Sequence, residues 1–251
     1  MTVTYDYTGR SVLVTGGTKG IGLGVARAFA RAGADVTVCA RHPPERAEFR
    51  FVPADVRAPE DIERLMAGFG RLDVVVNNAG GSPYAPLADT SPRLHARVID
   101  LNLTAPLLVA QYARPLLAAA RGAVVMIGSA SGVRPSPGTS AYGAAKAGLH
   151  HLARCLAAEW APEVRVNTVV VGLAATEAAA TGHYGDQGLG AAIPAGRLAT
   201  PADVAEACLW LAAPGYVTGA EVRVDGGGEI PLWRSLAENR AAENRAEEER
   251  S

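Results

Sequence analysis

Short apolar runs rich in valine alternate along the chain with longer segments whose apolar residues recur at helical spacing. The apolar runs indicate buried strands, because they hold few polar residues and are bounded by glycine and other turn-forming residues. The predicted strands cover residues 11–17, 35–41, 49–56, 72–81, 123–129, 164–171 and 220–228. The predicted helices cover residues 21–33 and 59–70, a long stretch from residue 91, and residues 139–160 and 200–213.

This alternation predicts an α/β fold in which one doubly wound parallel sheet carries helices on both faces, as in a Rossmann fold. A single domain is expected over residues 1–233, because 251 residues are enough for one sizeable core. Residues 234–251 differ, since they repeat AENR and are too polar to pack alone. We predict that this charged tail is helical or disordered.

Composition narrows the range of partners. The net charge of −1 and the absence of a basic block argue against nucleic acid. No apolar run approaches the roughly 20 residues of a membrane span, and the first residues do not resemble a signal peptide. The cysteines Cys39, Cys155 and Cys208 are odd in number and far apart, so we expect small core residues in a reducing cytoplasm.

A glycine-rich turn, TGGTKGIG over residues 15–22, joins the first predicted strand to the first helix. Glycines allow a tight turn and close approach of a pyrophosphate, whose charge then lies at the helix N-terminus. Strand, turn and helix in this order favour a dinucleotide site over a structural turn. The expected binding residues are Gly16, Thr18, Lys19, Gly20, Ile21 and Gly22.

The end of the second predicted strand bears on the choice of cofactor. An NAD site of this type usually has an acidic residue there for the ribose 2′-hydroxyl, but this strand ends in Arg41 and has Asp35 at its start. Arg41 and Lys19 offer two cations for a 2′-phosphate. We therefore predict NADP(H) rather than NAD(H), the alternative being that both are ordinary surface charges.

Two further strand ends offer cofactor contacts. Asp55 and Val56 close the third predicted strand, where an adenine ring could be bracketed. The fourth ends in the run 77–80, NNAG, of which Asn78, Ala79 and Gly80 are expected to bind the cofactor. The carboxamides can fix neighbouring loops through backbone hydrogen bonds, and the small residues leave space for a ribose.

The candidate chemistry lies between Ser129 and Lys146. Tyr142 and Lys146 are four residues apart and so share a helix face, and a lysine ammonium favours a tyrosine phenolate, whose ordinary pKa is near ~10. Ser129, at the end of the preceding strand, can offer a second hydroxyl to the same oxygen. Taken alone, the pair could be a chance surface pair. Asn102, inside the long helix, could bend it and hold a water, or be a satisfied polar group.

In this order, these motifs resemble those of the classical short-chain dehydrogenase/reductase family over about Gly9 to Gly228. The resemblance implies that Tyr142 is the general acid, that Lys146 holds the nicotinamide ribose and acidifies the tyrosine, and that Ser129 binds the substrate oxygen. It further implies that Asn102 anchors a water leading to Lys146, and that Gly172 and Thr176 lie at the nicotinamide. Val171 stands where the family usually has proline.

We therefore expect an NADP(H)-dependent oxidoreductase that reduces a ketone, such as a 3-oxoacyl or polyketide-like carbonyl, to a secondary alcohol. Alternatives are an alcohol dehydrogenase working in the oxidative direction and a non-catalytic NADP(H) sensor or partner protein. The resemblance also implies a homotetramer, with a dimer as the alternative. No metal site is expected, because the histidines are poorly spaced for one; most should lie at the surface or an interface, and His183 could contact substrate.

Overall fold

The structure is a computed structural model that describes residues 3–46, 48–175 and 189–229. The strands are β1 Ser11–Thr15, β2 Asp35–Ala40, β3 Arg50–Pro53, β4 Val74–Asn77, β5 Ala123–Ser129, β6 Arg165–Val171 and β7 Glu221–Val224. The helices are α1 Gly20–Arg31, α2 Pro59–Ala67, α3 Pro92–Ile99, α4 Ala105–Ala120, α5 Ser140–Trp160 and α7 Pro201–Ala212. The charged tail predicted at residues 234–251 lies outside the described residues.

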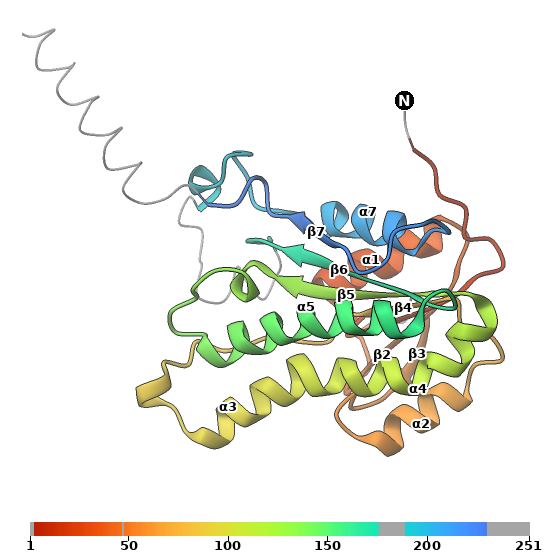
Figure 1. Ribbon diagram of the computed structural model, residues 1–251, viewed down its shortest axis with the longest axis horizontal. Helices are drawn as coiled ribbons and strands as arrows, with labels where there is room; N and C mark the ends of the chain where they lie inside the picture. The colour runs from red at the N-terminus through yellow and green to blue at the C-terminus, as the bar shows by residue number, and fades with distance from the viewer. Residues whose placement is uncertain (1–2, 47, 176–188, 230–251) are drawn as a thin grey trace, which may run out of the picture.

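The described strands form one sheet in the order β3-β2-β1-β4-β5-β6-β7, and all neighbouring strands are parallel. Helices cover both faces, with α1 and α7 on one side and α2, α4 and α5 on the other (Figure 1). Alternate strand residues enter the two cores, so Val12 and Val14 pack under α1 and α7 while Leu13 faces the opposite layer. The predicted doubly wound α/β fold is confirmed.

The direction of winding reverses between β1 and β4. From β1 the chain adds β2 and β3 on one side, and it then returns to place β4 on the other side of β1. Ligands of doubly wound sheets bind outside the carboxyl ends of the strands at such a reversal. The glycine turn after β1 and the NNAG run after β4 are therefore brought together at the point expected for a ligand.

The long helix expected from residue 91 is interrupted. Between α3 and α4 the chain forms a π-helical turn, Asp100–Thr104. Asn102 lies in this turn, and its Nδ2 donates to the carbonyl of Val98, four residues earlier, at 2.9 Å. A side chain that bonds this carbonyl competes with the regular helical backbone bond, and the turn widens.

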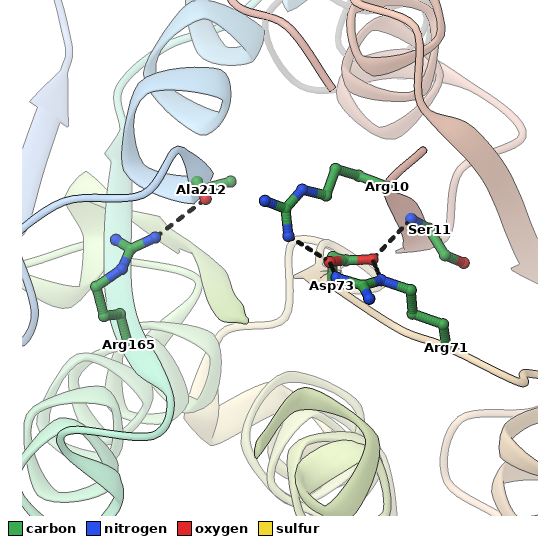
Figure 2. A network of polar contacts seen from close by, with 6 residues as sticks. All are labelled: Arg10, Ser11, Arg71, Asp73, Arg165 and Ala212. Atoms are coloured by element: carbon green, nitrogen blue, oxygen red, sulfur yellow. Dashed lines mark hydrogen bonds and ion pairs between the residues drawn. The ribbon is translucent and has the colours of Figure 1, made fainter. Parts of the chain in front are cut away.

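Ion pairs link the chain at the amino ends of the strands, at the end of the sheet opposite the glycine turn and the NNAG run (Figure 2). The Asp73 carboxylate is 3% exposed and accepts from Arg10 at 2.7 Å, from Arg71 at 2.7 and 2.8 Å, and from the Ser11 amide at 3.0 Å. Burial alone would raise the pKa of Asp73, but these donors outweigh it and hold the pKa below its usual value. Nearby, Arg165 donates to the last carbonyls of α7, including that of Ala212 at 3.0 Å. This network lies at the edge of the sheet remote from the predicted chemistry.

Two of the three cysteines fulfil the prediction of small core residues. Cys39 and Cys208 are buried, and burial raises the pKa of each thiol to about 12. Cys155 is only partly buried, so the prediction is wrong for that residue. Among the described helices, none has the length and apolar character needed to cross a membrane.

Candidate active site

The glycine-rich turn opens directly onto the N-terminus of α1. Gly16 and Gly20 adopt positive φ angles of 63° and 54°, which favour glycine. A Cβ atom on Gly22 would lie 2.3 Å from the carbonyl oxygen of Gly16, so the first turn of α1 can approach the loop only with glycine there. Lys19 caps α1 without a side-chain hydrogen bond, and the first turn holds no acidic residue. The backbone N–H groups at this helix end therefore suit an anion such as a pyrophosphate.

A network centred on Thr15 locks this turn to the NNAG run. The Thr15 hydroxyl oxygen accepts from the amides of Asn78 and Ala79, each at 3.0 Å. The Asn78 side chain donates to the carbonyls of Thr15 and Gly16 at 2.9 and 3.1 Å. The predicted role of the carboxamide in fixing neighbouring loops is confirmed. Thr15 was not predicted, although a hydroxyl at the last position of a buried strand is a signal for it.

A cavity of about 550 Å³ lies beside the glycine turn and continues along the end of β2. Its lining includes three cations, Lys19, Arg41 and Arg46. Within the described ranges, no carboxylate lies within 4.0 Å of Lys19 or Arg41. Asp35 is at the other end of β2, opposite Ser11, as its position in the sequence predicted. Glu45 and Glu48 also line the cavity, so its charge is mixed. Lys19 and Arg41 nevertheless have no described carboxylate within ion-pair distance, and an anionic group could lie beside them.

The residues predicted to bracket an adenine ring lie just after β3. The Asp55 carboxylate pairs with Arg57 at 2.6 Å, and the hydrogen bonds from Arg57 hold the pKa of Asp55 below its usual value. Val56 is 7% exposed and packs into the core beneath α2. The Val56 side chain is therefore largely committed to the fold, and Asp55 remains partly exposed at the sheet edge.

Lys146 places a buried ammonium group in the candidate active site. Its Nζ donates to the carbonyl of Ile127 at 2.8 Å and lies 5.7 Å from the centroid of the Tyr142 ring. Burial lowers the pKa of Lys146 to about 8, so the ammonium form still predominates at pH 7. A positive charge at this distance stabilises a negative charge on the tyrosine more strongly than it would in bulk water.

The loop that follows β5 packs against the first turn of α5, next to Tyr142. Ser129 ends β5, and its Oγ accepts from the amide of Ser131 at 3.2 Å. A Cβ atom on Gly143 would lie 2.8 Å from the carbonyl oxygen of Ser131, so this contact needs glycine. The loop bearing Ser129 and the helix turn bearing Tyr142 are thus neighbours, which is the arrangement that their predicted action on one oxygen needs.

Asn102 is fully buried and makes three hydrogen bonds to backbone groups. Its Oδ1 accepts from the Gly81 amide at 3.0 Å, and its Nδ2 donates to the carbonyls of Gly81 and Val98 at 2.8 and 2.9 Å. A Cβ atom on Gly80 would lie 2.7 Å from Asn102 Oδ1 and 3.4 Å from Lys146 Nζ. The end of the NNAG run therefore passes between these two side chains, and it can do so only with a small residue.

The residues that the resemblance placed at the nicotinamide are described in part. Gly172 follows β6, and a Cβ atom there would lie 2.8 Å from the Cα atom of Asp225, so the position requires glycine. Thr176 and His183 lie outside the described residues. Most histidines were expected at a surface or interface, and His150 is an exception at 3% exposure, because its ring is enclosed against the end of β5. No cluster of metal-ligating side chains occurs among the described residues.

Comparison with known proteins places this arrangement among enzymes. The family model described as enoyl-(acyl carrier protein) reductase matches residues 16–229. The chain is 39% identical over 241 residues to cis-4-hydroxycyclohexanecarboxylate dehydrogenase of Sinomonas cyclohexanicum, covering 87% of this chain and 96% of that protein. It is 33% identical over 240 residues to a 3-oxoacyl-[acyl-carrier-protein] reductase of Chlamydia muridarum, with coverage of 87% and 96%. A solved structure described as a short chain dehydrogenase/reductase family protein is 36% identical, with a TM-score of 0.82 over 89% of this chain and 98% of that chain.

Proposed function

This chain belongs to the short-chain dehydrogenase/reductase family of oxidoreductases, and from that premise we propose that it reduces a ketone to a secondary alcohol with NADPH. The observation that supports the proposal most directly is the buried Lys146 ammonium, 5.7 Å from the Tyr142 ring and one helical turn away. A charge with so little solvent around it has a cost to the fold, which chemistry at Tyr142 would explain.

In the proposed mechanism, a reduced nicotinamide, when bound, would supply a hydride to the carbonyl carbon of the substrate. Tyr142 donates a proton to the carbonyl oxygen, and the Lys146 ammonium stabilises the phenolate that remains. The Ser129 hydroxyl donates a hydrogen bond to the same oxygen as negative charge develops on it. Asn102, placed beside Lys146 across Gly80, is proposed to anchor the water through which the proton is replaced.

The residues at the glycine turn and cavity fit a dinucleotide carrying an additional phosphate. The first turn of α1 offers N–H groups, and Gly22 allows close approach of the loop. We propose that Lys19 and Arg41, which line the cavity, bind a 2′-phosphate. NADP(H) carries this phosphate and NAD(H) lacks it, so the proposed cofactor is NADP(H). Other proposed contacts come from the strand ends, namely Asp55, Val56, Asn78, Ala79, Gly80 and Gly172, with Thr176 beyond the described residues.

The proposed substrate is a small ketone, with a 3-oxoacyl or polyketide-like carbonyl as one candidate. The similarity to a 3-oxoacyl-[acyl-carrier-protein] reductase supports that candidate, whereas the similarity to a dehydrogenase of a cyclic hydroxy acid supports the oxidative direction. The same proton relay serves both directions, because each step reverses.

Assembly and location are also proposals. We propose a cytoplasmic homotetramer, with a dimer as the alternative. Exposed aromatic side chains on and after α7, Trp210 at 46% and Tyr216 at 102% exposure, support an interface on that side. Light scattering of the purified protein tests this, and a monomer would contradict it.

The proposed reaction is tested by following NADPH oxidation with a panel of ketones that includes ethyl acetoacetate, acetoacetyl-CoA and cyclic ketones. Each is assayed with NADPH and with NADH. Turnover of at least one ketone, with a clear preference for NADPH, is the expected result. Binding of NADPH without turnover of any ketone, or of any secondary alcohol with NADP⁺, would instead favour a non-catalytic sensor.

A further inference from the structure

His150 lies in α5, one turn beyond Lys146, and its imidazole is wedged against the loop that bears Ser129. A Cβ atom on Gly128 would lie 2.4 Å from His150 Nε2, and one on Gly132 would lie 2.9 Å from Cε1. The ring therefore fits only because both neighbouring positions are glycine. A histidine enclosed in this way, at 3% exposure, needs partners for both of its ring nitrogens.

The first partner is the backbone of Ser129, whose amide donates to His150 Nε2 at 3.2 Å. This bond lies beyond the end of β4, which pairs with β5 as far as Asn77, opposite Met126. Beyond that point, two side chains of α5 bond the backbone of β5. Lys146 Nζ donates to the Ile127 carbonyl at 2.8 Å, and His150 accepts from the Ser129 amide. Helix α5 thus fixes the last residues of β5, which include Ser129.

The bond from Ser129 decides the protonation state of the ring, and the carboxylate of Glu221 faces the other ring nitrogen. Nε2 can accept the Ser129 amide only when it carries no proton, so the neutral ring has its proton on Nδ1. Nδ1 lies 3.7 Å from Oε2 of Glu221, at the start of β7, and Glu221 also pairs with Arg154 at 2.5 Å. The charged groups around the ring are therefore Glu221, Arg154 and Lys146. Burial lowers the pKa of His150, Lys146 and Arg154 add to this effect, and Glu221 opposes it.

We propose that His150 is a positioning residue that holds Ser129 through its backbone amide, and that it does so only as the neutral imidazole with the proton on Nδ1. The proposal rests on the proposed function, in which Ser129 binds the substrate carbonyl. Protonation would place an N–H at Nε2 against the N–H of Ser129, so that two donors face each other. Ser129 then shifts, and its hydroxyl loses alignment with the carbonyl oxygen. Activity should therefore fall on the acid side as His150 gains its proton.

The kinetic test compares His150→Gln, whose amide oxygen can still accept, with His150→Leu, which fills similar space without an acceptor. His151→Gln is the matched control, because His151 is exposed on the next position of the same helix. With NADPH and the best ketone of the panel, His150→Leu should lower kcat by about 10-fold to 100-fold, since a buried amide loses its partner. KM for NADPH should stay within about twofold of the wild-type value, and His150→Gln should regain most of kcat. The acid limb of the wild-type pH profile should be absent in His150→Gln. Equal kcat in wild type and His150→Leu would overturn the proposal.

A second measurement does not depend on turnover. Nitrogen-15 NMR of the full-length protein, with the His150 signals assigned by difference from His150→Gln, reports which ring nitrogen carries the proton. We expect the neutral Nδ1–H form at pH 7, and a Ser129 amide signal that shifts as His150 titrates but is pH-independent in His150→Gln. A charged ring or the Nε2–H form at pH 7 would overturn the proposal. A wild type that reduces no ketone would refute the proposed function, and the NMR result would still decide the role of His150 at Ser129.

Discussion

Replacing Lys146 with methionine removes a charge that the fold buries while keeping the length of the side chain. Burial lowers the pKa of Lys146 from 10.5 to about 8, a difference of about 2.5 (10.5 − 8). At about 1.4 kcal/mol for each unit, the native state disfavours the ammonium by roughly 3 kcal/mol. The neutral amine can donate the same hydrogen bond from Nζ to Ile127 O, at 2.8 Å, so this bond is not part of the pKa difference. Methionine loses it and leaves a buried carbonyl without a partner, which costs roughly 1–3 kcal/mol. The two effects oppose each other, so Lys146→Met should change the free energy of unfolding at pH 7 by no more than about 2 kcal/mol, whereas breaking a buried ion pair costs about 3–5 kcal/mol.

The pH dependence gives the sharper result. The folded pKa of Lys146 lies below the unfolded value, so between about pH 8 and pH 10.5 the unfolded chain binds more protons than the native protein. The cost of the buried charge is complete below pH 8 and is relieved as the pH rises through this window. Wild type should therefore gain roughly 2 kcal/mol relative to Lys146→Met between pH 7 and pH 9.5.

Urea unfolding of both proteins, followed by tryptophan fluorescence at one protein concentration and at pH 7, 8 and 9.5, measures this difference. Subtracting the variant removes the contributions of all other titrating groups that the two proteins share. A stability difference that does not change with pH would refute the reasoning. So would a loss of more than about 3 kcal/mol at pH 7 in Lys146→Met, because Lys146 would then be acting as an ordinary structural anchor.

Three further substitutions test other parts of the molecule. Arg41→Ser should raise Kd for NADPH about 10-fold or more and leave Kd for NADH within about twofold, because a charge-assisted bond to the 2′-phosphate is lost; fluorescence titration measures both, and equal weakening would contradict the assignment. Ser129→Ala should lower kcat by about 100-fold or more at unchanged Kd for NADPH, whereas a loss of less than about threefold would remove Ser129 from the mechanism. Asp73→Asn should lower the free energy of unfolding at pH 7 by about 2 kcal/mol, measured in urea against the exposed control Asp89→Asn. Because the pKa of Asp73 is lowered in the native state, the stability that its carboxylate contributes should be lost as the pH falls through this lowered pKa. Equal free energies of unfolding for Asp73→Asn and Asp89→Asn at pH 7 would contradict this prediction.

The sequence predicted the existence and order of the strands better than their ends. A buried parallel strand is marked by its apolar run, but its length depends on the neighbours that it pairs with. The strand predicted over residues 72–81 becomes β4 Val74–Asn77, because the amides of Asn78 and Ala79 leave the sheet and bond the Thr15 hydroxyl. The strand predicted over 49–56 is reduced to β3, which lies at the edge of the sheet and, among the described strands, pairs with β2 alone.

The candidate site was predictable where its residues lie close together in the sequence. The positions of Tyr142 and Lys146 on α5 follow from helical spacing, and the glycine turn follows from its place between a strand and a helix. The burial of His150 was not predictable in this way, because it depends on Gly128 and Gly132, which lie about 20 residues earlier and meet the ring only in the folded chain. The π-helical turn likewise contains a side-chain bond from Asn102 to Val98, as well as bonds to Gly81, and helical spacing does not reveal these contacts.

The central claim is that Tyr142 supplies the proton to a carbonyl beside the bound cofactor. Stopped-flow absorbance at about 340 nm, with enzyme and NADPH mixed against a ketone that wild type reduces, measures hydride transfer in a single turnover. Tyr142→Phe should bind NADPH with Kd within about twofold of wild type and transfer hydride about 10³-fold more slowly, in line with the loss of a general acid. Hydride transfer at the wild-type rate in Tyr142→Phe would contradict the account.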